Sequence, residues 1–117
     1  MTKDELVAMV KGGEVFEKAD LSGLDLAGAD LGGGIFERVD FSRSNLTDAK
    51  LKECTFSRCS FEGAELVRAN LHHVIMHACK LVLATFEDAY APLLSLSACD
   101  VTMARFSGAM LFGASIG

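Results

Sequence analysis

Residues 19–33, ADLSGLDLAGADLGG, repeat one pattern every five residues. Leu21, Leu26 and Leu31 stand at the same place in three successive units. Large apolar residues continue at every fifth position from Phe16 to Ile116. Of these 21 positions, only Ala91 is not a large apolar residue. The register therefore runs through nearly the whole chain without an insertion.

Small residues form a second series, two positions before each large apolar residue from residue 21 onward. Eighteen of these twenty positions hold Ala, Cys, Val, Gly or Ser, and the exceptions are Leu24 and Leu94. A period of five matches neither a helix, with 3.6 residues per turn, nor a strand, with a period of two. The chain must turn at a regular short interval, with two residues of every five facing inward. This pattern predicts a solenoid.

Several segments resemble the repeat unit of the pentapeptide-repeat family, alanine, then Asp or Asn, then leucine and two variable residues. They include Ala29-Asp30-Leu31-Gly32-Gly33, Ala64-Glu65-Leu66-Val67-Arg68 and Ala69-Asn70-Leu71-His72-His73. The resemblance implies an all-β solenoid, a right-handed quadrilateral β-helix in which four pentapeptides make one coil. About five coils would span residues 14–117. Members of the family share architecture more than activity, so the resemblance implies little about function.

The segment before the repeats predicts a short helix over residues 2–11. Thr2 and Glu5 have the spacing of a capping box, and Gly12-Gly13 would end the helix. Solenoids need a polar cover over the end of their core. We therefore expect residues 1–13 to form an N-terminal capping helix and residues 14–117 to form the β-helix.

Composition excludes several classes of protein. At 117 residues the chain is one domain, and its net charge of −5 comes with neither a basic patch for nucleic acid nor an acidic tail. No uncharged run reaches the ~20 residues of a membrane span. The acidic start differs from a signal peptide. We expect a cytoplasmic protein that binds neither membranes nor nucleic acid directly, with secretion by a route without such signals as the alternative.

All four cysteines fall at the small inward position: Cys54, Cys59, Cys79 and Cys99. If residues twenty apart stack at ~4.8 Å, Cys79 lies within disulfide range of both Cys59 and Cys99. Their side chains would point in parallel, however, and cytoplasmic thiols stay reduced. Their spacing matches no zinc signature. We expect four buried, reduced thiols; a disulfide and a metal site are the alternatives.

Charged residues occupy outward columns on most sides of the predicted coil. Lys18, Arg38 and Arg58 stack beside Glu17 and Glu37, which predicts a solvated ladder of ion pairs. A group of aspartates precedes the large apolar residues of the first two coils. Aspartate at such a position bonds locally in turns. Recognition of a partner is the alternative explanation for this acidic group.

The fourth side of the coil changes from polar to apolar toward the C-terminus. Its outward positions include Tyr90, Pro92, Leu93, Met110 and Phe112. A contiguous exposed apolar patch usually marks an interface. Alternatively, the coil is disturbed around Ala91-Pro92 and these side chains fold inward.

Catalytic and metal-binding patterns are missing from the sequence. His72 and His73 would face outward from one side, His77 from the next, and Cys79 inward, so the four cannot converge on a metal. Neither a nucleophile with its base nor a pair of carboxylates in a cleft is recognisable. We expect a protein that is not an enzyme and holds no cofactor and no metal.

The sequence favours a non-enzymatic interaction module, a rigid rod that docks an unidentified protein partner through its outward side chains. Resemblance to particular branches of the family implies two alternatives. One is a secretion-associated adaptor or immunity protein of type VI systems, and the other is a DNA mimic that protects a type II topoisomerase.

The last coil raises a separate expectation. Ile116 holds an inward position one residue before the end of the given sequence, so the apolar surface below it would be open. An uncovered terminal repeat invites association. We expect a two-fold homodimer joined through the C-terminal coils. Docking on another protein or domain is the alternative.

Overall fold

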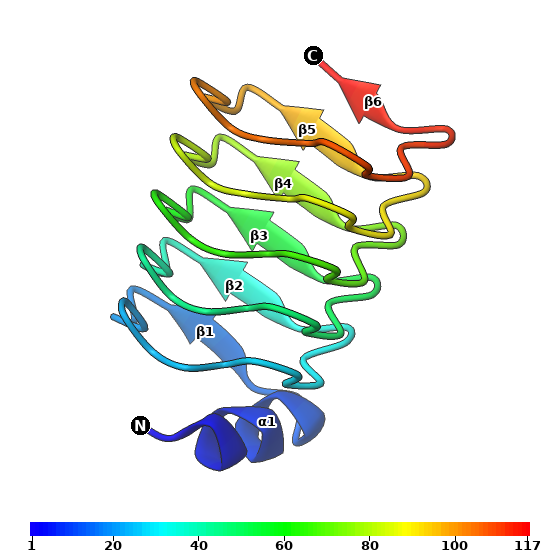
Figure 1. Ribbon diagram of the computed structural model, residues 1–117. Coiled ribbons are helices and arrows are strands. Elements are labelled where there is room, and N and C mark those ends of the chain that lie inside the picture. The colour runs from blue at the N-terminus through cyan, green and yellow to red at the C-terminus, as the bar shows by residue number, and fades with distance from the viewer.

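The computed structural model describes residues 1–117, which wind into a column of stacked coils (Figure 1). Six short strands mark one side of the column: β1 (Val15–Glu17), β2 (Ile35–Glu37), β3 (Thr55–Ser57), β4 (Ile75–His77), β5 (Ser95–Ser97) and β6 (Ser115–Ile116). They form one parallel sheet in chain order. Each residue pairs with the residue twenty positions later, as Phe16 does with Phe36.

Three further lines of parallel bridges complete the coil. They begin with Asp20↔Asp40, Asp25↔Asn45 and Asp30↔Lys50. We call the strand side face one and these three lines faces two, three and four. Four sides of five residues give a coil of twenty, and the whole molecule measures 31 × 20 × 20 Å. The predicted solenoid of about five coils with a short N-terminal helix is confirmed.

Every corner of the coil uses the same backbone turn. From Lys18 to Gly113, each fifth residue has a φ between 53° and 75°, and fourteen of these twenty residues are not glycine. A side chain in this left-handed region costs roughly 1–2 kcal/mol. Hydrogen bonds between coils offset that cost, because the corner N–H itself donates to the next coil. Arg43 N, for example, donates to Glu62 O at 2.9 Å.

Aspartate and asparagine side chains before the large apolar residues also stabilise the turns of the coil through local hydrogen bonds. Asp20, Asp25 and Asp30 accept hydrogen bonds through Oδ1 from the N–H groups of Ser22 (3.0 Å), Ala27 (3.1 Å) and Gly32 (3.1 Å). Hydrogen bonds from the hydroxyl and the N–H of Ser22 hold the pKa of Asp20 below its usual value. The acidic group in the first coils is therefore explained by turn geometry.

The interior is filled by stacked columns of large side chains. Phe36 lies between Phe16 and Phe56, with ring centroids 5.4 and 5.1 Å apart and nearly parallel planes. Phe41 and Phe61 repeat this stacking at 5.0 Å. Because each coil places its apolar side chain over the one before it, the core is continuous, and the interior holds no pocket.

Helix α1 (Lys3–Lys11) covers the N-terminal end of this core. It begins one residue later than predicted, because Thr2 is its cap: Glu5 N donates to Thr2 Oγ1 at 3.2 Å, and Thr2 N donates to Glu5 Oε1 at 2.8 Å. Leu6 is fully buried against the first coil. None of the helical structure combines the length and hydrophobicity of a membrane span.

Ala91 and Leu94 exchange the large and small inward positions of one corner. Elsewhere on face four a large residue comes first, as in Leu71 and Val74, whereas here the small Ala91 comes first and the large Leu94 follows. Both are buried, and Ala91 N still donates to Met110 O at 2.9 Å. The alternative of a disturbed coil whose neighbours fold inward is therefore wrong.

This exchange predicts energetic coupling between the two positions. Leu94→Ala should lower the free energy of unfolding by about 2–5 kcal/mol, because it leaves a cavity. Ala91→Leu should lower it by about 1–3 kcal/mol through overpacking. The double variant should recover much of the sum, measured by urea denaturation. Strictly additive losses would show that the two side chains do not share one space.

The cysteines occupy the small inward column as expected, with one exception in their burial. Cys54, Cys59 and Cys79 are buried, whereas Cys99 is half-buried. The prediction of four buried thiols is wrong for Cys99, because it lies in the last coil and nothing covers it. All four are free thiols, and each Sγ donates to a carbonyl of the preceding coil, as Cys54 does to Leu31 O at 2.9 Å.

Three stacked thiols influence one another. The neighbouring side chain of Cys79 lowers the pKa of Cys59. The neighbouring thiol of Cys59 raises the pKa of Cys79 to about 12. The thiol of Cys79 in turn raises the pKa of Cys99. Burial raises the pKa of Cys54 to about 12.

The rates of thiol labelling should follow the burial of the four cysteines. Cys54 and Cys79 are buried, so they should react with a maleimide at pH 7.5 only as fast as the protein unfolds. Cys99 should react first among the four. Peptide mapping by mass spectrometry at a series of times would identify the labelled residue. Labelling of Cys54 at the rate seen in urea would contradict the assigned burial.

Candidate interaction surfaces

Charged columns on faces one and three form ion pairs between neighbouring coils. Arg58 Nη1 lies 3.0 Å from Glu37 Oε1, and Arg68 contacts both carboxylate oxygens of Asp48 at 2.9 and 3.1 Å. These side chains are exposed, so each pair contributes at most about 1 kcal/mol. The columns therefore belong to the architecture of the rod, as their stacking predicted.

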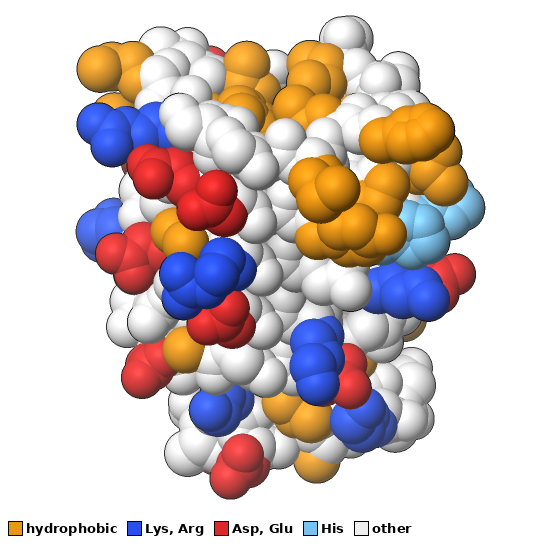
Figure 2. Space-filling model, turned by 45° about the vertical axis from the view of Figure 1, so that its right-hand side comes forward, with side chains coloured by type: hydrophobic (Ala, Val, Ile, Leu, Met, Phe, Trp, Pro, Cys, Tyr) orange, Lys and Arg blue, Asp and Glu red, His pale blue; other side chains and the backbone are white.

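Five apolar residues lie together on the outward side of face four, and we call them the lateral patch: Tyr90, Pro92, Leu93, Met110 and Phe112. Their exposed fractions reach 77 % for Phe112 and 59 % for Met110, and Tyr90 and Leu93 remain about half exposed. The bridge Tyr90↔Met110 places two of them in successive coils. Figure 2 shows hydrophobic side chains gathered on this side of the rod.

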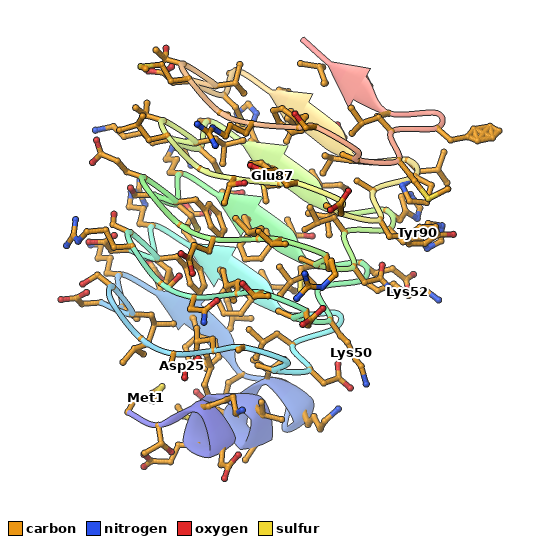
Figure 3. The ribbon with its side chains drawn as sticks, viewed as in Figure 1. Met1, Asp25, Lys50, Lys52, Glu87 and Tyr90 are labelled. Carbon is orange, nitrogen blue, oxygen red and sulfur yellow. The ribbon has the colours of Figure 1, made fainter.

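Toward the N-terminus the lateral patch gives way to histidines and then lysines. The ring of His72 lies 6.1 Å from the ring of Tyr90 and 6.2 Å from that of His73. One coil further, Lys50 and Lys52 point outward from face four (Figure 3). His77 lies on face one instead, where its Nδ1 is 2.8 Å from Ser97 Oγ.

The last coil presents a second apolar surface, which we call the end surface: Val101, Phe106, Leu111 and Ile116. Ile116 is 55 % exposed and Val101 36 %, whereas Leu81, one coil before Val101, is fully buried. Leu81 N donates to Asp100 O at 2.7 Å, but the N–H of Val101 has no backbone partner. Both apolar side chains and unpaired backbone donors are therefore exposed to solvent at this end.

The structure separates residues that sequence reasoning had combined into one interface. Tyr90, Pro92, Leu93, Met110 and Phe112 lie on the side of the rod, and Ile116 lies at its end in β6. Sequence reasoning also missed Leu83 and Met103, which are 55 % and 73 % exposed at the corner between faces two and three. Their outward column could have been found by the same twenty-residue alignment.

Charge is distributed unevenly along the rod. Of the 27 charged residues, only four follow residue 82: Glu87, Asp88, Asp100 and Arg105. Arg105 Nη1 lies 3.4 Å from Glu87 Oε1, so two of the four are paired with each other. The C-terminal coils are therefore the least charged part of the surface and also its most apolar part. This arrangement is suited to binding another molecule.

Comparison with known proteins agrees with the observed architecture. A family model for pentapeptide repeats matches residues 19–58 and 49–88, with eight copies of the repeat. No curated protein sequence matches the chain.

Solved structures similar to this chain include three pentapeptide-repeat or resistance proteins. One from the thylakoid lumen of Arabidopsis thaliana is 22 % identical, over 87 % of this chain and 64 % of its own, with a TM-score of 0.59. A pentapeptide repeat protein from Nostoc PCC 7120 is 20 % identical, over 99 % and 96 %, with a TM-score of 0.62. QnrB1, a plasmid-mediated fluoroquinolone resistance protein, is 22 % identical over 86 % and 51 %, with a TM-score of 0.48.

At these identities the structural matches show the fold alone, and the chain spans only about half to two-thirds of the Arabidopsis protein and QnrB1. The family model, by contrast, covers more than half of the chain, in the same register as the coils. The chain therefore belongs to the pentapeptide-repeat family, whose members typically act as structural or interaction scaffolds and not as catalysts.

Proposed function

We propose that this protein is a non-enzymatic protein–protein interaction module that docks through the apolar surfaces of its C-terminal coils. The observation that carries the proposal is the concentration of exposed large apolar side chains in those coils, where charge is scarce. Contiguous apolar surface of this kind marks interfaces in soluble proteins. Four free cysteines suit a reducing compartment, so we place the module in the cytoplasm.

The first partner we propose is a second copy of the chain, joined end to end. The rod has a cross-section of 20 × 20 Å, so an end contact covers roughly 400 Å² of each copy, or about 800 Å² in total, which is the size of a weak or transient interface. Unpaired backbone groups of the last coil, such as the N–H of Val101, can add hydrogen bonds across the contact. A two-fold axis lets the same end surface serve both copies.

DNA mimicry has less support. The aspartates of the first coils are bound to their own corners, and the basic columns of Arg38, Arg58 and Arg68 interrupt the acidic ones. The type VI adaptor or immunity role rests on the sequence resemblance alone. Docking of an unidentified protein partner is therefore better supported than mimicry of DNA toward a type II topoisomerase.

Sedimentation velocity at micromolar concentrations tests the dimer. Wild-type protein should sediment as a dimer, and Val101→Asp combined with Ile116→Asp should make it monomeric, because both place a charge in the end surface. Leu83→Asp is the matched control, since Leu83 is equally exposed but lies away from the end. Circular dichroism should show an unchanged fold in all variants.

Two results would contradict this prediction. A wild-type protein that stays monomeric at these concentrations excludes the dimer. A dimer that survives the double substitution, or that Leu83→Asp disrupts equally, places the contact elsewhere on the rod.

A further inference from the structure

We propose that face four is a second docking surface, separate from the end surface, and that it binds an amphipathic helix of another protein. The helix would carry carboxylates at one end and large apolar side chains at the other. Its binding site, which we call the face-four strip, comprises Lys50, Lys52, His72, His73 and the lateral patch. The inference deepens the proposed function, because it names the chemistry of a partner for the same module.

The strip has a continuous geometry. Lys50, Asn70, Tyr90 and Met110 bridge one another in succession, so four coils present one column. At ~4.8 Å per coil, the column is about 14 Å long, which matches roughly nine residues of helix. The rod has no pocket on this face or elsewhere, so a partner must lie along the surface.

Backbone hydrogen bonding decides between a helical and an extended partner. Lys50 N donates to Ala29 O at 2.8 Å, and Tyr90 N donates to Ala69 O at 3.0 Å. Lys50 O and Tyr90 O in turn accept from Leu31 N and Leu71 N. Face four therefore offers no free strand edge to an extended peptide. A helix satisfies its own backbone groups and binds such a face through side chains.

The positive charge at one end of the face-four strip determines which end of the partner helix carries carboxylates. Neither Lys50 nor Lys52 makes an ion pair, whereas the nearby Asp30 is paired with Lys11 at 3.2 Å. Glu53 is the other acidic residue on this part of the face. The lysine end is thus locally positive on a protein whose net charge is −5. Carboxylates of a partner fit this end, and they also speed its approach.

Aromatic groups link the charged end of the strip to its apolar end. Tyr90 is 47 % exposed, and its ring lies beside His72 near the middle of the strip. Tyrosine is enriched among the residues that dominate binding energy, because it combines an apolar ring with a polar tip. We therefore expect Tyr90 and its neighbour Leu93 to contribute most of the affinity.

A second copy of this chain does not fit the strip. A two-fold axis perpendicular to the rod would place Lys50 and Lys52 of one copy against Met110 and Phe112 of the other, and a two-fold axis parallel to the rod would place the lysines of both copies against one another. Burying an ammonium group against apolar side chains without a partner is unfavourable. The strip therefore requires a partner of opposite polarity, and self-association uses the end surface.

A displayed library of sixteen-residue helical peptides, selected against the wild-type protein, provides the probes. Selected peptides should carry Asp or Glu near one end and Leu, Phe or Trp near the other. Binding of the strongest peptide to the wild type and to each variant would be measured by fluorescence anisotropy. Lys50→Gln with Lys52→Gln should weaken binding by about 2- to 30-fold, and Tyr90→Ser with Leu93→Ser by more than about 30-fold.

Matched controls separate the strip from the rest of the surface. Lys80→Gln removes an equally exposed, unpaired lysine from face two. Leu83→Ser removes a leucine that has the same backbone conformation as Leu93, with φ of 60° and 61°. Neither control should change the affinity for the selected peptide. Ile116→Asp should weaken the dimer but leave peptide binding unchanged.

Three outcomes would overturn the inference. They are a selection that enriches no peptide, peptides without acidic residues, and binding that the controls reduce as much as the strip variants do. None of these depends on the dimer, which sedimentation measures separately. If the dimer is absent but the peptide binds the strip, then the proposed self-association fails and this inference stands.

Discussion

The stacking of each residue on the residue twenty positions later is the constraint on which the rest of the structure depends. Inter-coil hydrogen bonds, such as Arg43 N to Glu62 O, hold that register. They also offset the left-handed conformation that every corner requires. Because a corner can close only at every fifth residue, a single insertion would shift all later side chains between core and surface. The unbroken five-residue pattern follows from this constraint.

The same register explains why the interior has no ligand cavity and why the outward residues form columns that a partner can contact. Stacked rings such as Phe36 and Phe56 leave no cavity for a ligand. Outward residues form columns whose members lie one coil apart, so a change of residue type along a column becomes a change along the face. On face four the column passes from Lys50 through Asn70 to Tyr90 and Met110. Function in such a rod can reside only in these columns and at the ends.

The two ends of the rod differ in a way that suits an interaction module. Helix α1 covers the N-terminal end with Leu6 and closes it with polar groups. The other end leaves Ile116 and Val101 partly exposed, beside an apolar side wall. The proposed self-association at the end and the proposed partner binding on the side are compatible, because they use different surfaces. This arrangement would let one short rod join two partner molecules.

The sequence by itself determined the solenoid, the inward and outward phases of each position, and the apolar character of Tyr90, Leu93, Met110 and Phe112. It could do so because a strict period converts position in the chain directly into position in space. Only the tertiary structure decided that Ala91 and Leu94 are both buried although the large and small positions are exchanged, since that depends on how neighbouring side chains pack. It also decided that Cys99 is half-buried. These properties depend on which coils lie above and below a residue, and a repeat pattern does not contain that information.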